Sequence, residues 1–443
     1  MSILEKIVEA KRKEIAKRKA SLKLSTMRKK LTNASHNFYR CLKGRNNIIA
    51  EIKFASPSMK EVRGRTVKEV AEAYDSYANA ISVLTDREFF KGDVSYIKEV
   101  SKHTKAPILR KDFIIDDYQV YESRYYGADA ILLIAQLLPE KKLSGLISLT
   151  GKLGMDALVE VHTKDELQKA VSCGAKIIGI NNRDISSEKM EVILSITKQL
   201  IPHVPKGIIV VSESGFSSRK DILDVNSNAV LIGSFLMKSG NITASLSSMH
   251  RCKVKICGIT SMEDAKMAIG HGADLLGFNF YNLSERNIST AKAKEIISSL
   301  PLSVQSVGVF VDGTVEGINS MAESTGIDFI QLHGNYIKGK YIRPVIHVRK
   351  VGENGIETPF QKEYITLYDT KSARHGGSGK SFNPSFLKGQ SGKIIIAGGL
   401  TQKNVSQALK LHPYGVDTAS GVEKSPGIKD GRKVKAFIEA VVA

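Results

Sequence analysis

Short runs of apolar residues alternate with longer mixed segments along most of this chain. Each run has the length and the Ile, Val and Leu content of a strand, and each intervening segment is long enough for one helix. Regular alternation of strands and helices predicts parallel sheets. The runs form two sets of eight, at residues 48–54, 80–86, 107–113, 130–135, 156–162, 177–183, 208–214 and 228–234, and at residues 254–259, 275–280, 306–311, 329–334, 344–351, 364–370, 394–399 and 415–421.

Eight strand–helix units in each set predict two (β/α)8 barrels, or TIM barrels, in tandem. The length of 443 residues is sufficient for two such domains. We expect the first domain to occupy residues 1–252 and the second to occupy residues 253–443. Extra helices within residues 1–45 should precede the first barrel and cover its bottom or its side.

The segment 1–45 is strongly basic, with 14 Lys and Arg against 3 Asp and Glu in a chain whose formal net charge is +20. Its apolar residues recur at helical spacing, which predicts a helix with one face on the barrel and a solvated basic face. The alternative is a helix that binds nucleic acid or a membrane surface. No aromatic residues interleave with the basic ones, so we expect neither partner, and the positive charge should attract small anionic phosphate substrates. The apolar residues are Ile3, Leu4, Ile7, Val8 and Ile15.

The composition of the chain argues against a membrane-spanning protein, a secreted protein and a protein stabilised by disulfides or a metal. No apolar run approaches the roughly 18 residues of a membrane-spanning helix, and glutamates interrupt the N-terminal segment, unlike a secretory signal. The four cysteines form no CxxC pattern and have no accompanying histidine cluster. We therefore expect a cytoplasmic protein with no disulfide framework and no metal site. The cysteines are Cys41, Cys173, Cys252 and Cys257.

Polar residues that end the barrel strands are the chemical candidates, because active sites of this fold lie at the carboxyl ends of the strands. Glu51 and Lys53 share one face of the first strand, since side chains alternate with a period of two. Lys111, Glu160 and Glu213 lie at or near the ends of the third, fifth and seventh strands. Neighbouring carboxylates and ammonium groups shift one another's pKa values and suit acid–base chemistry. The alternative for each residue is a salt bridge that ties layers of the barrel together.

Serine and glycine follow the last two strands of the first set, as Ser214-Gly215 and Gly233-Ser234. Barrels commonly bind phosphate at these two loops through backbone N–H groups. Together the loops predict a phosphate subsite in the first barrel.

The first half of the chain contains five distinctive motifs, EIKFASPS (51–58), SVLTD (82–86), KDFIID (111–116), GINNRD (179–184) and SESG (212–215). They resemble the indole-3-glycerol phosphate synthase family, and the resemblance covers residues 1–250. Members of that family close the ring of an anilino-deoxyribulose phosphate with loss of CO2 and water. One departure is Met59-Lys60, where the family often has Lys-Gly, and we expect altered loop behaviour at most.

This resemblance implies a role for each candidate residue. Lys111 would be the general acid at the substrate carbonyl, and Glu160 would be the acid and base of the dehydration step. Glu51 and Lys53 would assist, and Lys53 also suits the substrate carboxylate. The remaining residues would contact the sugar hydroxyls (Asn181, Glu213, Ser214), the phosphate (Ser56, Gly215, Gly233, Ser234) and the aromatic ring (Phe90, Phe113, Leu132, each of which could equally be ordinary core).

The second set of strands has a different pair of candidates. Cys257 ends its first strand, with Lys255 on the same side, and an electropositive setting lowers a thiol pKa and makes the thiolate a usable base. A buried cysteine is otherwise usually inert. Asp369 ends the sixth strand and could act as the matching acid. Gly398-Gly399 and Ser420-Gly421 repeat the phosphate arrangement of the first barrel.

Five motifs of the second half, KICGIT (255–260), QLHG (331–334), GGSGKSF (376–382), AGGL (397–400) and GVDTASGVE with PGIKD (415–430), resemble the phosphoribosylanthranilate isomerase family. That family converts an aminoaldose to an aminoketose by an Amadori rearrangement. The resemblance implies that Cys257 removes the C2 proton and that Asp369 protonates the ribose ring oxygen. Further residues would bind phosphate (Gly398, Gly399, Ser420, Gly421), meet the anthranilate carboxylate (Arg286) or line the pocket (His333, Asp417).

The second barrel also departs from its family, which often has Ser-Pro-Arg where this chain has Ser284-Glu285-Arg286. Glu285 adds a negative charge beside an anionic ligand, and we expect weaker binding of the isomerase substrate.

The two resemblances together imply a monomeric, bifunctional enzyme of tryptophan biosynthesis that needs no metal or organic cofactor. One alternative keeps the fold but changes the chemistry, because phosphate-binding barrels also isomerise histidine-pathway intermediates and decarboxylate nucleotides. The pairs Lys111 with Glu160 and Cys257 with Asp369 argue against it. The other alternative is a nucleic-acid-binding protein that uses its basic N-terminal helices.

Overall fold

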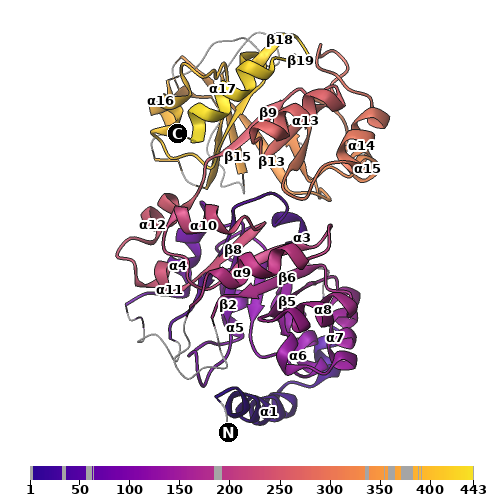
Figure 1. The fold of residues 1–443 in the computed structure, drawn as a ribbon, viewed down its shortest axis with the longest axis vertical. Coiled ribbons are helices and arrows are strands. Elements are labelled where there is room, and N and C mark those ends of the chain that lie inside the picture. The colour runs from indigo at the N-terminus through magenta and orange to yellow at the C-terminus, as the bar shows by residue number, and fades with distance from the viewer. Residues whose placement is uncertain are drawn as a thin grey trace. The chain divides into compact units, whose positions relative to one another are not determined.

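The protein divides into two compact units, Met1–Met249 and His250–Ala443, each with its own barrel and core (Figure 1). The computed structural model describes residues 3–31, 36–55, 62, 64–183, 192–334, 339–353, 355–357, 365–370, 383–387, 389–390 and 392–442. Within these residues no helix has the length and apolar character needed to cross a membrane.

The first unit contains a closed barrel of eight parallel strands in sequence order. β1 closes the barrel by pairing with β8, with Asn47 opposite Ala229. All residues of β1, β2, β4, β6, β7 and β8 are buried, which explains why these strands are continuous apolar runs. The strands are β1 (Asn47–Ile52), β2 (Ala80–Leu84), β3 (Ile108–Lys111), β4 (Ala130–Ile134), β5 (Asp156–Val161), β6 (Ile177–Asn181), β7 (Ile209–Glu213) and β8 (Ala229–Ile232).

The second unit contains the second eight-stranded parallel barrel, so the prediction of two tandem barrels is confirmed. Pairing of β12 with β13 closes it. Two elements were not predicted, namely β14 (Gly355–Ile356), which pairs antiparallel with β13, and a hairpin of β18 (Glu423–Ser425) and β19 (Ile428–Lys429). The barrel strands are β9 (Lys253–Cys257), β10 (Leu275–Asn279), β11 (Gln305–Phe310), β12 (Phe329–Leu332), β13 (Val345–Gly352), β15 (Ile365–Thr370), β16 (Lys393–Ile396) and β17 (Gly415–Thr418).

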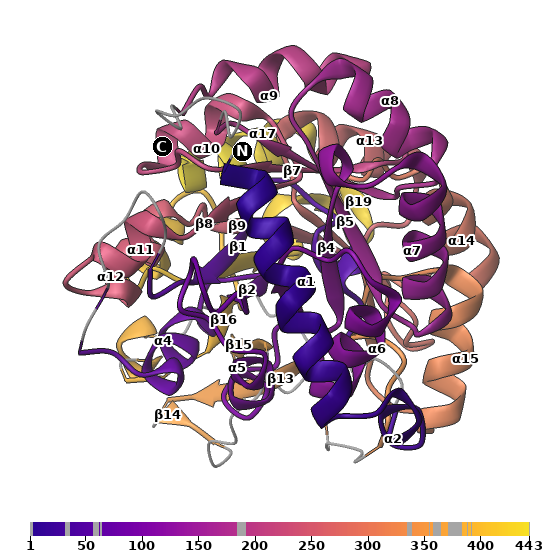
Figure 2. The ribbon, with the colours of Figure 1, turned by 90° about the horizontal axis from the view of Figure 1, so that it is seen from below.

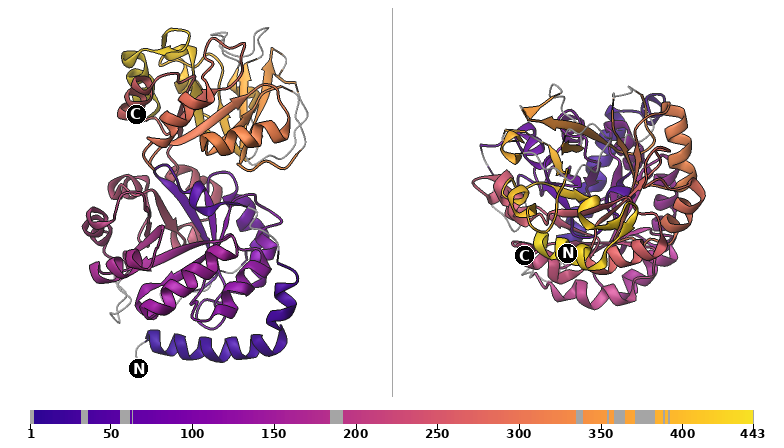
Figure 3. Two further views of the ribbon diagram at one scale, coloured as in Figure 1. Left: turned by 90° about the vertical axis from the view of Figure 1, so that its right-hand side faces the viewer. Right: turned by 90° about the horizontal axis from the view of Figure 1, so that it is seen from above.

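Helices surround the strands of each unit (Figure 3). Several begin at a local capping signal, such as Thr66 with Glu69 before α4 and Asp116 with Gln119 before α6, where each side chain bonds the other residue's backbone. Gly127 ends α6 in the left-handed conformation, at φ +101°. The barrel helices are α4 (Val67–Tyr74), α5 (Ser95–Val100), α6 (Asp117–Tyr126), α7 (Glu140–Lys152), α8 (Lys164–Ser172), α9 (Ser195–Leu200), α10 (Arg219–Val225), α11 (Ser234–Lys238) and α12 (Ile242–Met249), then α13 (Met262–His271), α14 (Thr290–Ser298), α15 (Val315–Thr325), α16 (Val405–Leu409) and α17 (Gly431–Val442).

The N-terminal helices α1 (Ile3–Ser21), α2 (Leu24–Arg28) and α3 (Phe38–Cys41) do not all lie where the sequence suggested. α3 lies at the amino ends of the strands, because the Tyr39 N–H donates to Asp156 at the start of β5. This agrees with the expected position at the bottom of the barrel.

Helix α1 lies at the opposite end of the first barrel, so the prediction of a bottom or side position is wrong for this helix. Figure 2 shows α1 crossing the barrel. The physical reason is Lys11, a buried residue whose ammonium group pairs with Asp86 and Asp112. These aspartates follow β2 and β3, so they lie at the carboxyl ends of the strands. The apolar face was predicted correctly, since Ile7 and Ile15 are buried.

A buried arginine connects β3 to α6. The Arg110 side chain is 1% exposed and donates to Asp112 and Glu122, at 2.9 Å each, and to Thr85 and Ser123. The hydrophobic pattern of β3 contains no signal for this network. Its carboxylates are stable in the interior because each has a cationic partner.

We expect Arg110→Met to destabilise the first unit by about 3–5 kcal/mol, because Asp112 and Glu122 would stay buried with one cation fewer. Lys142→Met, which removes the exposed pair with Asp117, should cost at most about 1 kcal/mol. Urea titration followed by circular dichroism, fitted with one transition per unit, measures both. If the first unit unfolded at the same urea concentration in both variants, Arg110 would not be the cation that stabilises the buried Asp112 and Glu122.

Candidate functional site

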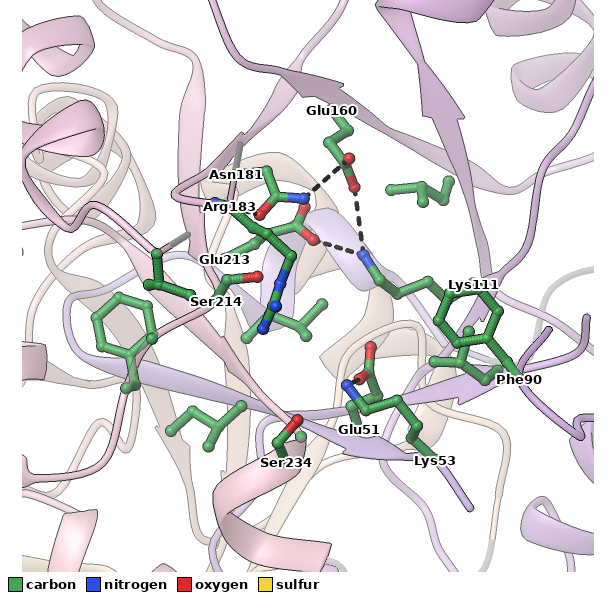
Figure 4. Close-up of a pocket in the computed structure, with 18 of the residues that line it drawn as sticks. Glu51, Lys53, Phe90, Lys111, Glu160, Asn181, Arg183, Glu213, Ser214 and Ser234 are labelled. Atoms are coloured by element: carbon green, nitrogen blue, oxygen red, sulfur yellow. Dashed lines mark hydrogen bonds and ion pairs between the residues drawn. The ribbon is translucent and has the colours of Figure 1, made fainter. Parts of the chain in front are cut away.

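The first barrel has a cavity of about 450 Å3 at the carboxyl ends of its strands (Figure 4). Helix α1 contributes Leu4 and Ile7 to its wall. The predicted site residues of this barrel that the structure describes all line it: Glu51, Lys53, Phe90, Lys111, Phe113, Leu132, Glu160, Asn181, Glu213, Ser214, Gly215, Gly233 and Ser234. Ser56, and the departure at Met59-Lys60, lie outside the described residues.

Lys111, at the end of β3, is the centre of the polar cluster. Its Nζ lies 2.6 Å from Glu213 Oε2 and 3.3 Å from Glu160 Oε2. Asn181 Nδ2 donates to the other oxygen of Glu160 at 3.1 Å. Figure 4 shows Glu160 and Glu213 meeting the ammonium group from separate strands, with Asn181 bonded to Glu160. One cation is therefore shared by two carboxyl groups inside a largely enclosed space.

The two carboxyl groups have opposite pKa shifts. Burial, together with the negative charge of Glu160, raises the pKa of Glu213 to about 7 against the opposing effect of Lys111. Burial also disfavours the charged form of Glu160, but Lys111 and His162 outweigh it and hold the pKa of that carboxyl below its usual range. For Lys111, the glutamates outweigh burial and raise the pKa above its ordinary value. Near neutral pH the site therefore holds a charged acid, a charged base and a carboxyl that is partly protonated.

His162 is a nearby residue that sequence reasoning missed. Its Nε2 lies 3.5 Å from Glu160, and its Nδ1 lies 3.3 Å from Glu166. Burial opposes protonation of the ring, but the hydrogen bond to Glu166 and the charge of Glu160 raise the pKa of His162 above its ordinary value. A signal was present, because His162 is two residues beyond Glu160 and so shares its direction on the strand.

Glu51 and Lys53 form a second ion pair at the cavity wall, with 2.8 Å between Lys53 Nζ and Glu51 Oε1. Phe90 and Phe113 also line the cavity, with their ring centroids 6.1 Å apart. The wall thus combines charged groups with an aromatic surface. This composition suits a ligand that has both an anionic group and a flat ring.

The loops after β7 and β8 form a third part of the cavity. Ser214 and Gly215 both have positive φ, +70° and +94°, so consecutive peptide groups turn in the left-handed region. Arg183 and Lys238 line the same cavity. Backbone N–H groups with two nearby cations are suited to an anion such as phosphate.

The second barrel has a smaller cavity, of about 90 Å3, also at its strand ends. Every predicted site residue of this barrel lines it: Cys257, Arg286, His333, Asp369, Gly398, Gly399, Asp417, Ser420 and Gly421. Residues 371–382, which include the whole GGSGKSF motif, lie outside the described residues. In the described parts of the chain, no group of three or more His, Cys, Asp or Glu is placed to hold a metal ion.

The predicted lowering of the Cys257 pKa is wrong. Burial raises the pKa of the thiol, the charge of Asp417 adds to the effect, and Lys255 only partly opposes it. Lys255 Nζ donates to Asp417 Oδ1 at 3.0 Å, so its positive charge is shared with a carboxylate. The sequence showed the lysine beside the cysteine but not the aspartate that faces it from β17.

The other charged residues of this cavity are also paired. Asp369 accepts from Lys350 of the neighbouring β13 at 2.6 Å. Arg286 donates to Glu423 at 2.8–3.2 Å, so its guanidinium already has a carboxylate partner. Glu285 is exposed and is not among the residues that line the cavity. Glu285 does act on a residue of the cavity through its charge: the pKa of Arg286 is raised mainly by its hydrogen bonds to Glu423, and the charge of Glu285 adds to this effect.

A family model matches each of the two barrels. Residues 4–249 match the model of indole-3-glycerol phosphate synthase, and residues 254–440 match that of N-(5'-phosphoribosyl)anthranilate (PRA) isomerase. The tryptophan biosynthesis protein TrpCF of Yersinia pestis is 35% identical over 99% of this chain and 94% of its own length. The protein of that name from Buchnera aphidicola subsp. Diuraphis noxia is 37% identical over 99% of this chain and 98% of its own length.

This chain belongs to the bifunctional synthase–isomerase family. It is a two-domain enzyme of tryptophan biosynthesis. Among solved structures, the phosphoribosyl anthranilate isomerase of Thermotoga maritima is 34% identical, covers 43% of this chain and 98% of its own, and has a TM-score of 0.39.

In this synthase–isomerase we expect a carboxyl titration near pH 7, assigned mainly to Glu213. The ordinary pKa of this carboxyl is 4.5. Between pH 4.5 and pH 7, the carboxyl has therefore lost its proton in the unfolded chain but still holds it in the folded one. The group's contribution to stability therefore falls as pH rises through that window. Carbon-13 NMR of glutamate-labelled protein measures the titration directly.

Glu213→Gln is the control for this titration. The signal near pH 7 should disappear, and the variant should lose less stability between pH 5 and pH 8 than the unmodified protein. A Glu213 signal that titrates near 4.5 would contradict the inference.

Proposed function

We propose that the two barrels catalyse consecutive steps. The second barrel would isomerise N-(5-phosphoribosyl)anthranilate to 1-(2-carboxyphenylamino)-1-deoxyribulose 5-phosphate. The first barrel would convert that product to indole-3-glycerol phosphate with loss of CO2 and water. The observation that carries the proposal is the convergence of Lys111, Glu160 and Glu213 on one cavity, in a chain that also holds Cys257 and Asp369 at a second.

In the first barrel, Lys111 is the general acid. Protonation of the substrate carbonyl by its ammonium group makes the carbonyl carbon electrophilic, and the aromatic ring carbon bearing the carboxylate attacks it. Loss of CO2 then restores the electron pair to the ring. Burial disfavours the charge of Lys111, but the neighbouring glutamates keep it protonated, so the proton that this step needs is present at neutral pH.

Dehydration follows ring closure, and Glu160 is its acid and base. The new hydroxyl group leaves as water after protonation, while a proton is removed from the neighbouring ring atom. Glu160 begins as the charged base, takes the proton from that ring atom and delivers it to the departing hydroxyl group, so its charge is restored. Lys111, which gave its proton to the carbonyl, regains one from water. Lys53 and Glu51 assist at the substrate carboxylate. Phe90, Phe113 and Leu132 pack against the aromatic ring, while Asn181, Glu213 and Ser214 hold the sugar hydroxyls.

In the second barrel, Asp369 protonates the ribose ring oxygen, and the ring opens to an iminium ion. Cys257 then removes the C2 proton, and the resulting enolamine rearranges to the aminoketone. His333, Asp417 and Arg286 line the same cavity.

Phosphate is held in each barrel by the loops after its last two strands. In the first barrel these are Gly215, Gly233 and Ser234, with Ser56 from outside the described residues. In the second they are Gly398, Gly399, Ser420 and Gly421.

We also propose the domain bounds, the oligomeric state and the location of the enzyme. Residues 1–252 form the synthase domain and residues 253–443 the isomerase domain. The enzyme acts as a monomer in the cytoplasm on small anionic phosphates, without a nucleic-acid partner.

Lys111→Met should lower the rate of indole-3-glycerol phosphate formation by about 10²–10⁴-fold, because the carbonyl loses its proton donor. The measurement is a time course with phosphoribosylanthranilate in which both the rearranged intermediate and the indole product are quantified. The intermediate should accumulate, since the second barrel is unaltered. Lys164→Met, an exposed lysine of α8, is the matched control and should behave as the unmodified protein. Indole formation at the normal rate in Lys111→Met would refute the assignment.

The isomerase step should speed up as pH rises above neutrality. Only the thiolate of Cys257 can take the C2 proton, and burial holds the thiol pKa above the ordinary 9.0. kcat/KM for loss of phosphoribosylanthranilate should therefore increase up to at least pH 9. Cys257→Ser should remove most of the activity, while synthase turnover of added intermediate stays normal. A rate that is already constant between pH 6 and pH 9 would show that another group is the base.

A further inference from the structure

Lys11 of α1 is a buried cation among three carboxylates. Its side chain is 2% exposed, and its Nζ lies 2.6 Å from Glu14, 2.7 Å from Asp86 and 2.8 Å from Asp112. Burial disfavours the ammonium charge, but Asp112, Asp86 and Glu14 outweigh it and raise the pKa of Lys11 above its ordinary value. The group therefore stays charged at working pH. None of the roles assigned above uses it.

Each of the two aspartates accepts hydrogen bonds from backbone that carries an aromatic residue of the synthase cavity. Asp86 accepts from the Phe89 N–H at 2.8 Å, and its carbonyl accepts from the Gly92 N–H at 2.7 Å. Phe90, which lines the cavity, lies within that turn. Asp112 accepts from the N–H of Phe113, the other aromatic residue of the wall, at 2.8 Å.

Lys11 also holds the half of α1 that borders the cavity. Leu4 and Ile7, which line the cavity, lie two turns and one turn before it on the helix. One ammonium group thus connects the helix that covers the cavity to both turns that carry its aromatic residues.

The other end of α1 has separate anchors. Arg18 pairs with Glu122 at 3.0 Å, Lys19 pairs with Asp116 at 2.8 Å, and the Tyr118 hydroxyl donates to the carbonyl of Arg18. Arg18 also pairs with Glu14, which Lys11 contacts, but the pairs with Glu122 and Asp116 and the Tyr118 hydrogen bond do not involve Lys11. Loss of the Lys11 charge should therefore release the N-terminal half of α1 and leave the C-terminal half attached.

We propose that Lys11 is a positioning residue of the synthase site, which sets the affinity for the aromatic part of the substrate by fixing Phe90, Phe113 and the covering end of α1. This inference rests on the proposed synthase function. The effect is local, because the phosphate loops after β7 and β8 have no contact with this network among the described residues.

The test compares Lys11→Met with Lys13→Met in the full-length protein. Lys13 is on the same helix, is 71% exposed and pairs only with Glu9 among the described residues. For Lys11→Met we expect KM for the carboxyphenylamino-deoxyribulose phosphate to rise about tenfold or more, with a smaller change in kcat, because the wall is misplaced while Lys111 remains. The inhibition constant of inorganic phosphate should stay within about twofold. Lys13→Met should leave all three values unchanged.

Hydrogen exchange gives a readout that does not depend on activity. In Lys11→Met the peptides that contain the amides of Phe89 and Phe113 should exchange about tenfold faster or more, while peptides of β7 and β8 keep their protection. A role in stability alone would lower the melting temperature of the first unit without this local pattern. Should Lys11→Met fail to fold, Lys11→Gln, which keeps a donor, takes its place in both measurements.

An unchanged KM in Lys11→Met, or unchanged exchange at both peptides, would overturn the proposal. Failure of the proposed function looks different, because the unmodified protein would then form no indole product although the exchange measurement remains valid. An equal rise in KM and in the phosphate inhibition constant would also overturn it, since the whole cavity would then be disturbed.

Discussion

Charged groups are buried at the mouth of the first barrel, and each of them needs oppositely charged partners. This requirement dominates the structure of the barrel. Removing an ammonium or carboxylate group from water costs several kcal/mol, and the cost is recovered only if each charge has well-placed partners. Lys111 has two carboxyl partners, and Lys11 has three. The groups that do chemistry and the groups that hold the covering helix thus obey the same condition. Their positions are fixed because any displacement leaves a charge without its partner.

Charge is shared unevenly between the two carboxyl groups of the first site. Two carboxyl groups compete for Lys111, and only one of them is fully compensated. Glu160 also has Asn181 and His162, whereas one oxygen of Glu213 is buried without a hydrogen-bond partner. The result is a base and a partly protonated carboxyl within reach of the same lysine. A symmetric arrangement would give two equivalent carboxylates and no separation of roles.

In the second barrel three carboxylates at or beside the cavity each have a cationic partner, and Glu423 has a second one, Lys429. Lys255 pairs with Asp417, Lys350 with Asp369, and Arg286 with Glu423. Cys257 lies beside the first pair, and because the lysine charge is offset by Asp417, burial decides its pKa. The two barrels therefore differ in how charge is divided at the strand ends, while their strand order is the same.

Sequence reasoning located the barrels and most candidate residues because both depend on local pattern. A buried parallel strand is a short apolar run, and its last residues point into the mouth of the barrel. The properties it missed depend on groups far apart in the chain. Lys11 resembles any other lysine of a basic helix until Asp86 and Asp112 are placed around it. The thiol pKa of Cys257 likewise depends on Asp417, which is 160 residues away in the sequence.

Glycine residues leave room for the long polar side chains of these sites inside barrels that are normally filled by branched apolar residues. A Cβ atom at Gly179 would collide with the Glu213 carboxyl, and one at Gly233 would collide with that of Glu51. In the second barrel a Cβ at Gly277 would lie 2.7 Å from the sulfur of Cys257. Each reactive group therefore occupies space that a neighbouring strand or loop leaves empty. The glycines are part of the active sites although they carry no chemistry, since even alanine at these positions would force the reactive group to move.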